Sequence, residues 1–163
     1  RATEGREFKG IIFFGLMLTP DGPRVLEYNA RFGDPETQAV LPRLENDLLE
    51  IMQAIIDQRL SEIKLSFKKD AAACIIAASG GYPQSYKKGY AISGLDAVED
   101  ATVFHSGTVF EDGTFKTNGG RVLGVTAMGE TLRAAVDKAY ENVKKISFTD
   151  MHYRTDIGKH GVV

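Results

Sequence analysis

Three polar side chains close together in the sequence, Glu27, Asn29 and Arg31, could take part in the same chemistry. They occupy alternate positions, so a β-strand would point them to one face. A carboxylate and an amide oxygen are hard ligands of the kind that Mg²⁺ or Mn²⁺ takes together with nucleotide phosphate oxygens. A metal ion and a guanidinium suit phosphoryl transfer, because its transition state spreads negative charge over oxygens. From spacing alone, a hairpin whose polar face meets water is an equally good interpretation.

The elements that must position these residues are predicted to be a hairpin followed by a helix. Residues 10–19 form a β-branched and aromatic run, and residues 20–23 form a Pro/Gly turn before a second strand over residues 24–29. Apolar residues then recur every three or four positions over residues 36–60, which predicts a helix. Pro42 is expected to divide it into a short and a longer helix.

The second half of the chain predicts a small antiparallel β-unit covered by a helix. Strand-like runs lie at residues 71–78, 101–110 and 121–127, and Gly-rich turns separate them. Residues 131–146 have the apolar stripe of an amphipathic helix that covers one face of a sheet. The fold class expected from these elements is α+β.

Composition and charge exclude several classes of protein. The chain has 163 residues, 43% of them apolar and 26% charged, which is typical of a globular protein and not of a disordered, collagen-like or coiled-coil one. The longest apolar run is strand-sized, well short of the ~18 residues of a membrane span. A net charge of −2 gives no field that would recruit nucleic acid or anionic lipid. The single cysteine, Cys74, favours a cytoplasmic setting.

The charge balance changes near Ile63 and predicts a domain boundary. Residues 1–62 carry 7 Lys and Arg against 11 Asp and Glu, whereas residues 63–163 carry 13 against 11. We therefore expect one domain over residues 1–62 and another over residues 63–163. The chain begins with Arg and is expected to be a piece of a longer protein.

A resemblance to a known family rests on motifs along nearly the whole chain. Glu27-x-Asn29-x-Arg31, at the end of a hairpin's second strand, resembles the metal and phosphate motif of the ATP-grasp ligases. The continuation RFGDPETQ, which begins at Arg31, resembles the signature of the phosphoribosylamine–glycine ligase family. The resemblance extends through Gly80-Gly81-Tyr82-Pro83, Asn118-Gly119-Gly120-Arg121 and the segment from Tyr153 to Gly158.

The resemblance implies a reaction and an architecture. In that family ATP, the co-substrate, phosphorylates glycine's carboxylate, and 5-phosphoribosylamine attacks the acyl phosphate to give glycinamide ribonucleotide, ADP and phosphate in de novo purine biosynthesis. Residues 1–62 would be the carboxy-terminal part of an ATP-grasp domain, and residues 63–163 the carboxy-terminal β-rich domain. The partners implied are these substrates and the amino-terminal domains of the same enzyme, without which the chain is expected to be inactive.

The resemblance also implies roles for residues that match its motif. Glu27 and Asn29 become ligands of Mg²⁺ or Mn²⁺, and Arg31 faces the γ-phosphate and then the acyl phosphate. Asp34 and Glu36 could orient an amine or glycine's ammonium, but a turn residue and a helix N-terminal residue are equally good interpretations. A second metal ion is not expected, because Phe14 or Gly15 occupies the position of a further carboxylate on the preceding strand.

A second anion site is predicted where Gly119, Gly120 and Arg121 open a strand. Two glycines let the backbone approach an anion, which the planar arginine fork then binds. In purine-pathway relatives the matching arginine resembles a binder of the ribose 5-phosphate, which implies substrate-binding roles for Gly120 and Arg121. A turn followed by an exposed edge arginine is the alternative. Lys87 and Lys88 are a weaker phosphate candidate.

Two other functional hypotheses remain open. The chain could belong to another ATP-grasp carboxylate–amine ligase, although such a ligase should not carry RFGDPETQ after the ExNxR motif. It could also be a non-catalytic binding module, which substitution of Glu27, Asn29 or Arg31 would have favoured. All three residues are intact, so a portion of a phosphoribosylamine–glycine ligase is the preferred hypothesis.

Overall fold

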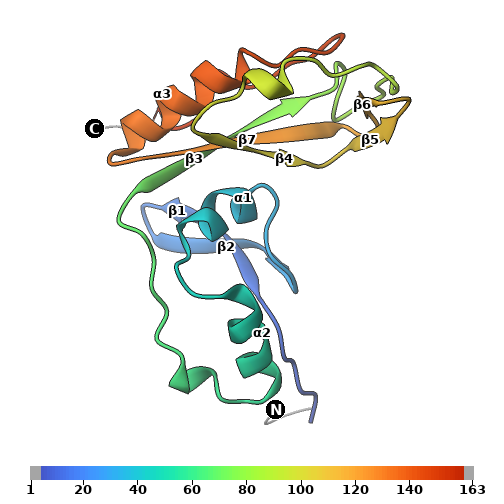
Figure 1. Ribbon diagram of the computed structural model, residues 1–163. Coiled ribbons are helices and arrows are strands. Elements are labelled where there is room, and N and C mark those ends of the chain that lie inside the picture. The colour runs from blue at the N-terminus through green and yellow to red at the C-terminus, as the bar shows by residue number, and fades with distance from the viewer. Residues whose placement is uncertain (1–4, 160–163) are drawn as a thin grey trace. The chain divides into compact units, whose positions relative to one another are not determined.

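The chain divides into two units in the computed structural model, which describes residues 5–159 (Figure 1). The first, which we call the hairpin unit, runs to Thr37 and resumes over Leu44–Lys68. The second, which we call the sheet unit, contains Gln38–Arg43 and the chain from Lys69 onward. The inserted segment Gln38–Arg43 means that no single cut in the sequence separates the two units. The boundary that the charge balance predicts between residues 62 and 63 stays a prediction.

The hairpin unit is built on two antiparallel strands, β1 (Phe13–Thr19) and β2 (Gly22–Asn29). The turn is shorter than predicted, because Gly22 and Pro23 already belong to β2. The Thr19 hydroxyl donates to the carbonyl of Gly22 at 2.7 Å, and Gly22 has a φ of 100°, a conformation that glycine adopts readily. The predicted hairpin is confirmed, with its first strand starting at Phe13 instead of Gly10.

Short helical segments follow the hairpin. They are α1 (Glu36–Val40), η1 (Leu41–Arg43), α2 (Leu48–Ile56) and η2 (Leu60–Glu62). The predicted interruption near Pro42 is present, but a helix reaching residue 60 is wrong, because α2 ends at Ile56. Asp47 starts α2 by accepting a hydrogen bond from the Leu49 amide at 2.8 Å.

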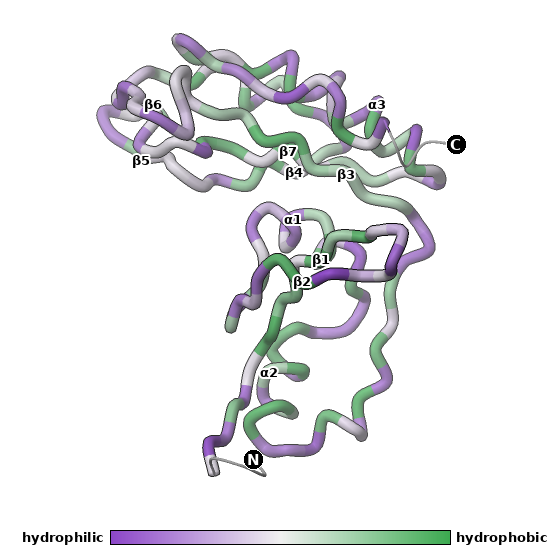
Figure 2. The backbone as a smooth tube through the Cα atoms, turned by 180° about the vertical axis from the view of Figure 1, so that it is seen from behind, coloured by the Kyte–Doolittle hydropathy of each residue, from purple (hydrophilic) through white to green (hydrophobic). Residues whose placement is uncertain are grey.

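The sheet unit has a three-stranded antiparallel sheet in the order β3 (Ala71–Ala78), β7 (Arg121–Gly129) and β4 (Ala101–His105). Helix α3 (Leu132–Val143) runs along one face of this sheet (Figure 1). The core lies between them and includes Ile75, Leu123, Val125, Ala139 and Val143, each with no exposed surface. Figure 2 shows hydrophobic residues along much of the central strand β7. The α+β class and the covering helix are confirmed.

The predicted single strand over residues 101–110 is wrong. Strand β4 ends at His105, and β5 (Thr108–Glu111) pairs in a separate ribbon with β6 (Thr114–Thr117), a strand that the sequence did not predict. A Cβ on Gly107 would lie 2.5 Å from the Cα of Gly119, so the two glycine backbones are in direct contact. This contact marks the break between β4 and β5. A short helix, η3 (Leu95–Ala97), precedes β4. No helix within residues 5–159 is long and apolar enough to cross a membrane.

Candidate active site

Glu27 lies opposite Gly15 in the hairpin, and its side chain crosses the space above this glycine. A Cβ on Gly15 would lie only 2.9 Å from the Glu27 Cγ. Any larger residue at position 15 would therefore displace the carboxylate stem. The sequence identified Gly15 only as a residue that cannot bind metal, whereas the structure shows that it makes room for the Glu27 side chain.

A β-bulge in the hairpin decides which side chains share a face. The register shifts between Gly15 and Leu16, so that Leu26 has no partner on β1. Glu27 and Asn29 lie on the same side of the bulge and pair with Gly15 and Phe13, which keeps them on one face as predicted. The bulge interrupts the alternation between Val25 and Glu27, so alternation along the strand does not place Val25 on this face.

Arg31 follows the end of β2 at Asn29, so strand alternation no longer fixes its direction. Its guanidinium Nη1 donates to the neighbouring carbonyl of Phe32 at 2.9 Å, and the side chain is exposed. The strand therefore neither directs the Arg31 side chain toward Glu27 and Asn29 nor prevents it from reaching them. The role of Arg31 beside the metal ligands stays a prediction that depends on a rotation of an exposed side chain.

A hollow of about 640 Å³ brings Glu27 and Glu36 together within the hairpin unit. The Glu36 carboxylate lies over Gly33, where a Cβ would be 2.5 Å from Oε2. The Thr37 amide donates to the Gly33 carbonyl at 3.1 Å and holds the start of α1. The remaining residues that line the hollow are Phe13, Phe14, Gly15, Leu16 and Leu26. Asp34 is exposed and does not line it.

The donor set of this face suits a metal ion that keeps much of its water. Residues 5–159 contain no group of three or more His, Cys, Asp and Glu side chains that could hold a metal ion. Glu27 and Asn29 supply one carboxylate and one amide oxygen from one strand face, on which Glu27 is exposed. Mg²⁺ is commonly bound in this way, by one or two carboxylates, water and substrate phosphates.

The predicted anion site in the sheet unit is a tightly held turn. Gly120 is buried, and a Cβ on it would lie 2.1 Å from Cδ2 of the Tyr82 ring, so only glycine fits. The amide of Ser79 donates to the Gly120 carbonyl at 2.8 Å. Arg121, at the start of β7, is half-buried, so the alternative of a fully exposed edge arginine does not describe it.

The weaker phosphate candidates lie close to this turn. Gly89, which follows Lys87 and Lys88, donates its amide to the carbonyl of Thr117 at 2.7 Å. Thr117 directly precedes the turn that leads to Arg121. Lys87 also lines a hollow of about 300 Å³ within the sheet unit, together with Gly80, Ser85, Tyr86, Tyr90 and Asp150.

Two family models match the chain in succession. The model described as "Phosphoribosylglycinamide synthetase, C domain" matches residues 72–160, more than half of the chain. The chain belongs to the phosphoribosylglycinamide synthetase family. The model described as "Phosphoribosylglycinamide synthetase, ATP-grasp (A) domain" matches residues 2–37, which include the hairpin. The family suggested by the sequence motifs is confirmed.

Similar proteins cover this family segment almost completely. A phosphoribosylamine–glycine ligase of Caldanaerobacter subterraneus subsp. tengcongensis is 52% identical over 94% of this chain and 37% of the relative. The bifunctional purine biosynthetic protein ADE1 of Schizosaccharomyces pombe is 52% identical over 98% of this chain and 20% of the relative. A crystal structure of a phosphoribosylamine–glycine ligase from Thermotoga maritima matches with a TM-score of 0.74 and 33% identity, over 89% of this chain and 36% of that one. The chain thus spans little more than a third of the ligases it matches.

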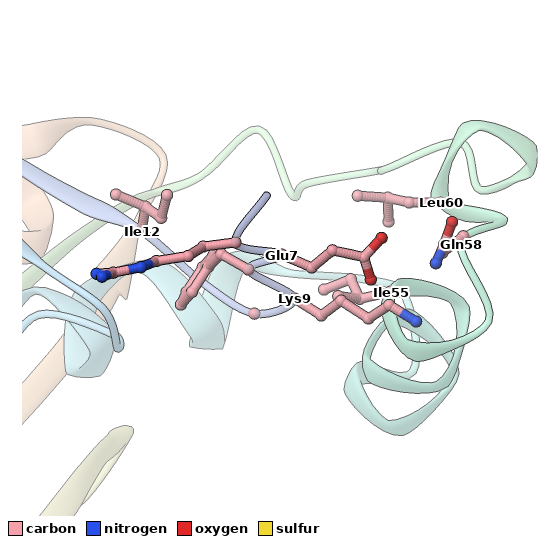
Figure 3. Close-up of a pocket in the computed structure, with 9 residues that line it drawn as sticks. Glu7, Lys9, Ile12, Ile55, Gln58 and Leu60 are labelled. Atoms are coloured by element: carbon pink, nitrogen blue, oxygen red, sulfur yellow. The ribbon is translucent and has the colours of Figure 1, made fainter. Parts of the chain in front are cut away.

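A further hollow in this synthetase segment has no link to the predicted chemistry. It measures about 500 Å³ and lies between the extended residues 6–12 and the end of α2 (Figure 3). The Lys9 ammonium donates to the Ile56 carbonyl at 2.8 Å and thereby satisfies the end of α2. None of the predicted site residues lines this hollow, and we assign it a structural role.

The structure draws attention to two residues, Ser79 and Tyr82, for which the sequence predicted no role. Both contact the Gly119–Gly120 turn from a segment about forty positions earlier in the chain. The available signal was the Gly80-Gly81-Tyr82-Pro83 motif, which resembled the family but suggested no partner.

Proposed function

We propose that this chain is part of an enzyme that joins glycine to 5-phosphoribosylamine at the expense of ATP. The γ-phosphoryl group of ATP is transferred to the glycine carboxylate, which gives glycyl phosphate and ADP. The amine of 5-phosphoribosylamine then attacks the acyl carbon, loses a proton and displaces phosphate, forming glycinamide ribonucleotide. The observation that carries this proposal is 52% identity, over nearly the whole chain, to a protein named as that ligase.

In this proposal the hairpin face holds the reacting phosphates. Glu27 and Asn29 bind Mg²⁺ or Mn²⁺, which when bound neutralises charge on the nucleotide phosphates. Arg31 turns from the Phe32 carbonyl toward the transferred phosphoryl group, where its fork binds oxygens whose charge changes during the reaction. Glu36, which shares the hollow with Glu27, binds the glycine ammonium, and exposed Asp34 assists in orienting an amine.

The sheet unit contributes the ribose phosphate subsite. Gly120, whose missing side chain leaves room for the Tyr82 ring, forms the turn directly before Arg121, and Arg121 binds the phosphate of 5-phosphoribosylamine. The remaining partners are ATP, glycine and the amino-terminal domains of the same enzyme, which this chain does not span. We also propose a cytoplasmic location for the enzyme, which the single cysteine favours.

The test is a magnesium titration of the full-length enzyme. Glu27→Gln preserves the shape of the side chain but removes the charged ligand, so the Mg²⁺ concentration for half-maximal ligation should rise about tenfold or more. Asn29→Ala should shift it in the same direction. The matched control is Glu62→Gln, at an exposed residue of η2 outside the hollow. A parental titration for Glu27→Gln would remove this residue from the metal site, and absence of ligation by the parent would reject the function.

A further inference from the structure

Ser79 joins the end of β3 to the turn that precedes Arg121. It is 2% exposed, and it makes two hydrogen bonds to consecutive carbonyls of that turn. Its hydroxyl donates to the Gly119 carbonyl at 2.8 Å, and its amide donates to the Gly120 carbonyl at 2.8 Å. A single buried residue therefore fixes two successive peptide groups.

Tyr82 holds the same turn by packing. Its ring lies against Gly120, so closely that a Cβ there would overlap Cδ2 and Cε2 at 2.1 and 2.5 Å. The Tyr82 amide donates to the Ser79 carbonyl at 3.1 Å, which ties the ring to the residue that makes the hydrogen bonds. The ring of Tyr86 meets Tyr82 edge-on, with centroids 6.1 Å apart.

Gly107 fixes the turn from another segment of the sheet unit. Its amide donates to the Arg121 carbonyl at 2.9 Å, and its carbonyl accepts from the Asn118 amide at 2.7 Å. The carbonyls of Gly119, Gly120 and Arg121 thus each accept a hydrogen bond from outside the turn. A backbone held at three successive carbonyls has little freedom to change the starting direction of the Arg121 side chain.

We propose that Ser79 and Tyr82 are positioning residues for Arg121 in binding the phosphate of 5-phosphoribosylamine. This inference rests on the proposed function. A guanidinium fork binds phosphate strongly only when its donors are held in the required geometry, and a backbone fixed before binding avoids the entropy cost of ordering it afterwards. Gly119 and Gly120 have no side chains that could fix the turn, so Ser79 and Tyr82 hold it from outside.

The experiment measures KM for each substrate in the full-length enzyme. Ser79→Ala removes the hydroxyl bond and should raise KM for 5-phosphoribosylamine by about two- to tenfold, the range of one net hydrogen bond. Tyr82→Ala should raise it at least as much, whereas Tyr82→Phe keeps the ring and should restore most of the parental value. The KM values for ATP and glycine should stay at their parental values. Arg121→Ala is expected to raise the same KM by roughly ten- to two-hundredfold.

A double-mutant cycle separates positioning from a general loss of stability. If Ser79 acts through Arg121, adding Ser79→Ala to Arg121→Ala should produce no further rise in KM. Val143→Ala is the stability control, because Val143 is fully buried in α3 and makes no contact with the turn among those described. It should lower Tm without changing KM for 5-phosphoribosylamine.

The outcomes distinguish failure of this inference from failure of the function on which it rests. If Arg121→Ala raises KM but Ser79→Ala and Tyr82→Ala leave it unchanged, or if Val143→Ala raises it equally, positioning is rejected and the phosphate subsite stands. Full additivity of Ser79→Ala and Arg121→Ala also rejects positioning. If Arg121→Ala leaves KM unchanged in an active ligase, the subsite and the positioning proposal are both rejected.

Discussion

The hairpin unit and the sheet unit place their apolar residues in opposite environments. On the hairpin, Leu18 is 82% exposed, and Leu26 and Tyr28 are 65% exposed. In the sheet unit, Ile75 and Leu123 have no exposed surface, because α3 covers their side of the sheet. A two-stranded ribbon has no second layer of its own and is marginally stable in water. A strand pattern therefore predicts the strand itself, but not whether another element of this chain covers its apolar residues.

The two units also hold their functional candidates differently. The side chains of Glu27 and Arg31 are both exposed, so both can move toward a ligand. The turn before Arg121 is fixed by hydrogen bonds from Ser79 and Gly107. We expect substitutions on the hairpin to change activity with little effect on folding, whereas substitutions in the sheet unit should also change stability.

The largest expected effect is on folding of the sheet unit. Ile75→Ala should lower the free energy of unfolding by about 2–5 kcal/mol, because it leaves a cavity between the sheet and α3. Leu18→Ala, the matched control on the hairpin, should change it by less than about 0.5 kcal/mol. Urea denaturation of this chain, followed by circular dichroism, measures both. Equal losses would contradict the contrast between the units.

The next largest effect concerns catalysis at the hairpin. In the full-length enzyme, Arg31→Lys should lower kcat by about 10²-fold, because a point charge cannot replace a bidentate fork on a group whose charge moves. The change in KM for ATP should be smaller. Arg24→Lys, at an exposed residue of β2, is the control and should keep the parental kcat. A parental kcat for Arg31→Lys would make Arg31 a structural residue.

Local sequence patterns predicted the strands and helices that depend mainly on neighbouring residues in the chain. The hairpin strands, β3 and β7 follow from strand-like runs bounded by turn residues, and the covering helix α3 follows from an apolar stripe. The break within residues 101–110 could not be predicted in this way, because it coincides with a contact between Gly107 and Gly119. The bulge at Leu26 could not be predicted from local sequence either, because the register of a strand depends on its partner strand.

The residues of the candidate site also divide into those that local sequence predicts and those that depend on distant contacts. Glu27 and Asn29 were predicted from residue type and spacing, and the structure confirms that they share a face. Residue type and the two preceding glycines also predicted Arg121 as an anion-binding residue. Ser79 and Tyr82 belong to no charged or metal-binding pattern, and the role proposed for them depends on contacts with a turn about forty residues away. Such supporting residues become visible only when the two segments are seen together.

Substitution of one helix cap in each unit tests whether the two units lose stability separately, with a smaller expected effect. Thr131 accepts from the Ala134 amide at 3.1 Å and caps α3, while Asp47 caps α2. Thr131→Ala and Asp47→Ala should each cost about 1 kcal/mol of local stability. Amide hydrogen exchange should show faster exchange in the sheet unit for Thr131→Ala and in the hairpin unit for Asp47→Ala. Uniform acceleration in both units would mean that they unfold together.

The smallest expected effect is the pH dependence of an exposed ion pair in the β5–β6 ribbon. The Lys116 ammonium lies 2.8 Å from the Asp112 carboxylate, and this hydrogen bond lowers the pKa of Asp112 below its ordinary 3.8 and raises the pKa of Lys116 above its ordinary 10.5. The contribution of Asp112 to stability is lost as the pH falls through its lowered pKa. The contribution of Lys116 to stability is lost as the pH rises through its raised pKa.

The variant Asp112→Asn tests this ion pair. Asp112 has a φ of 51°, which asparagine tolerates, so the substitution removes the charge without adding backbone strain. The Tm difference between parent and Asp112→Asn should be largest between about pH 5 and pH 9 and shrink toward both extremes. It should also shrink in 1 M salt, because exposed charges are screened. A difference that persists at pH 2 or in high salt would show that Asp112 stabilises the turn by means other than its charge.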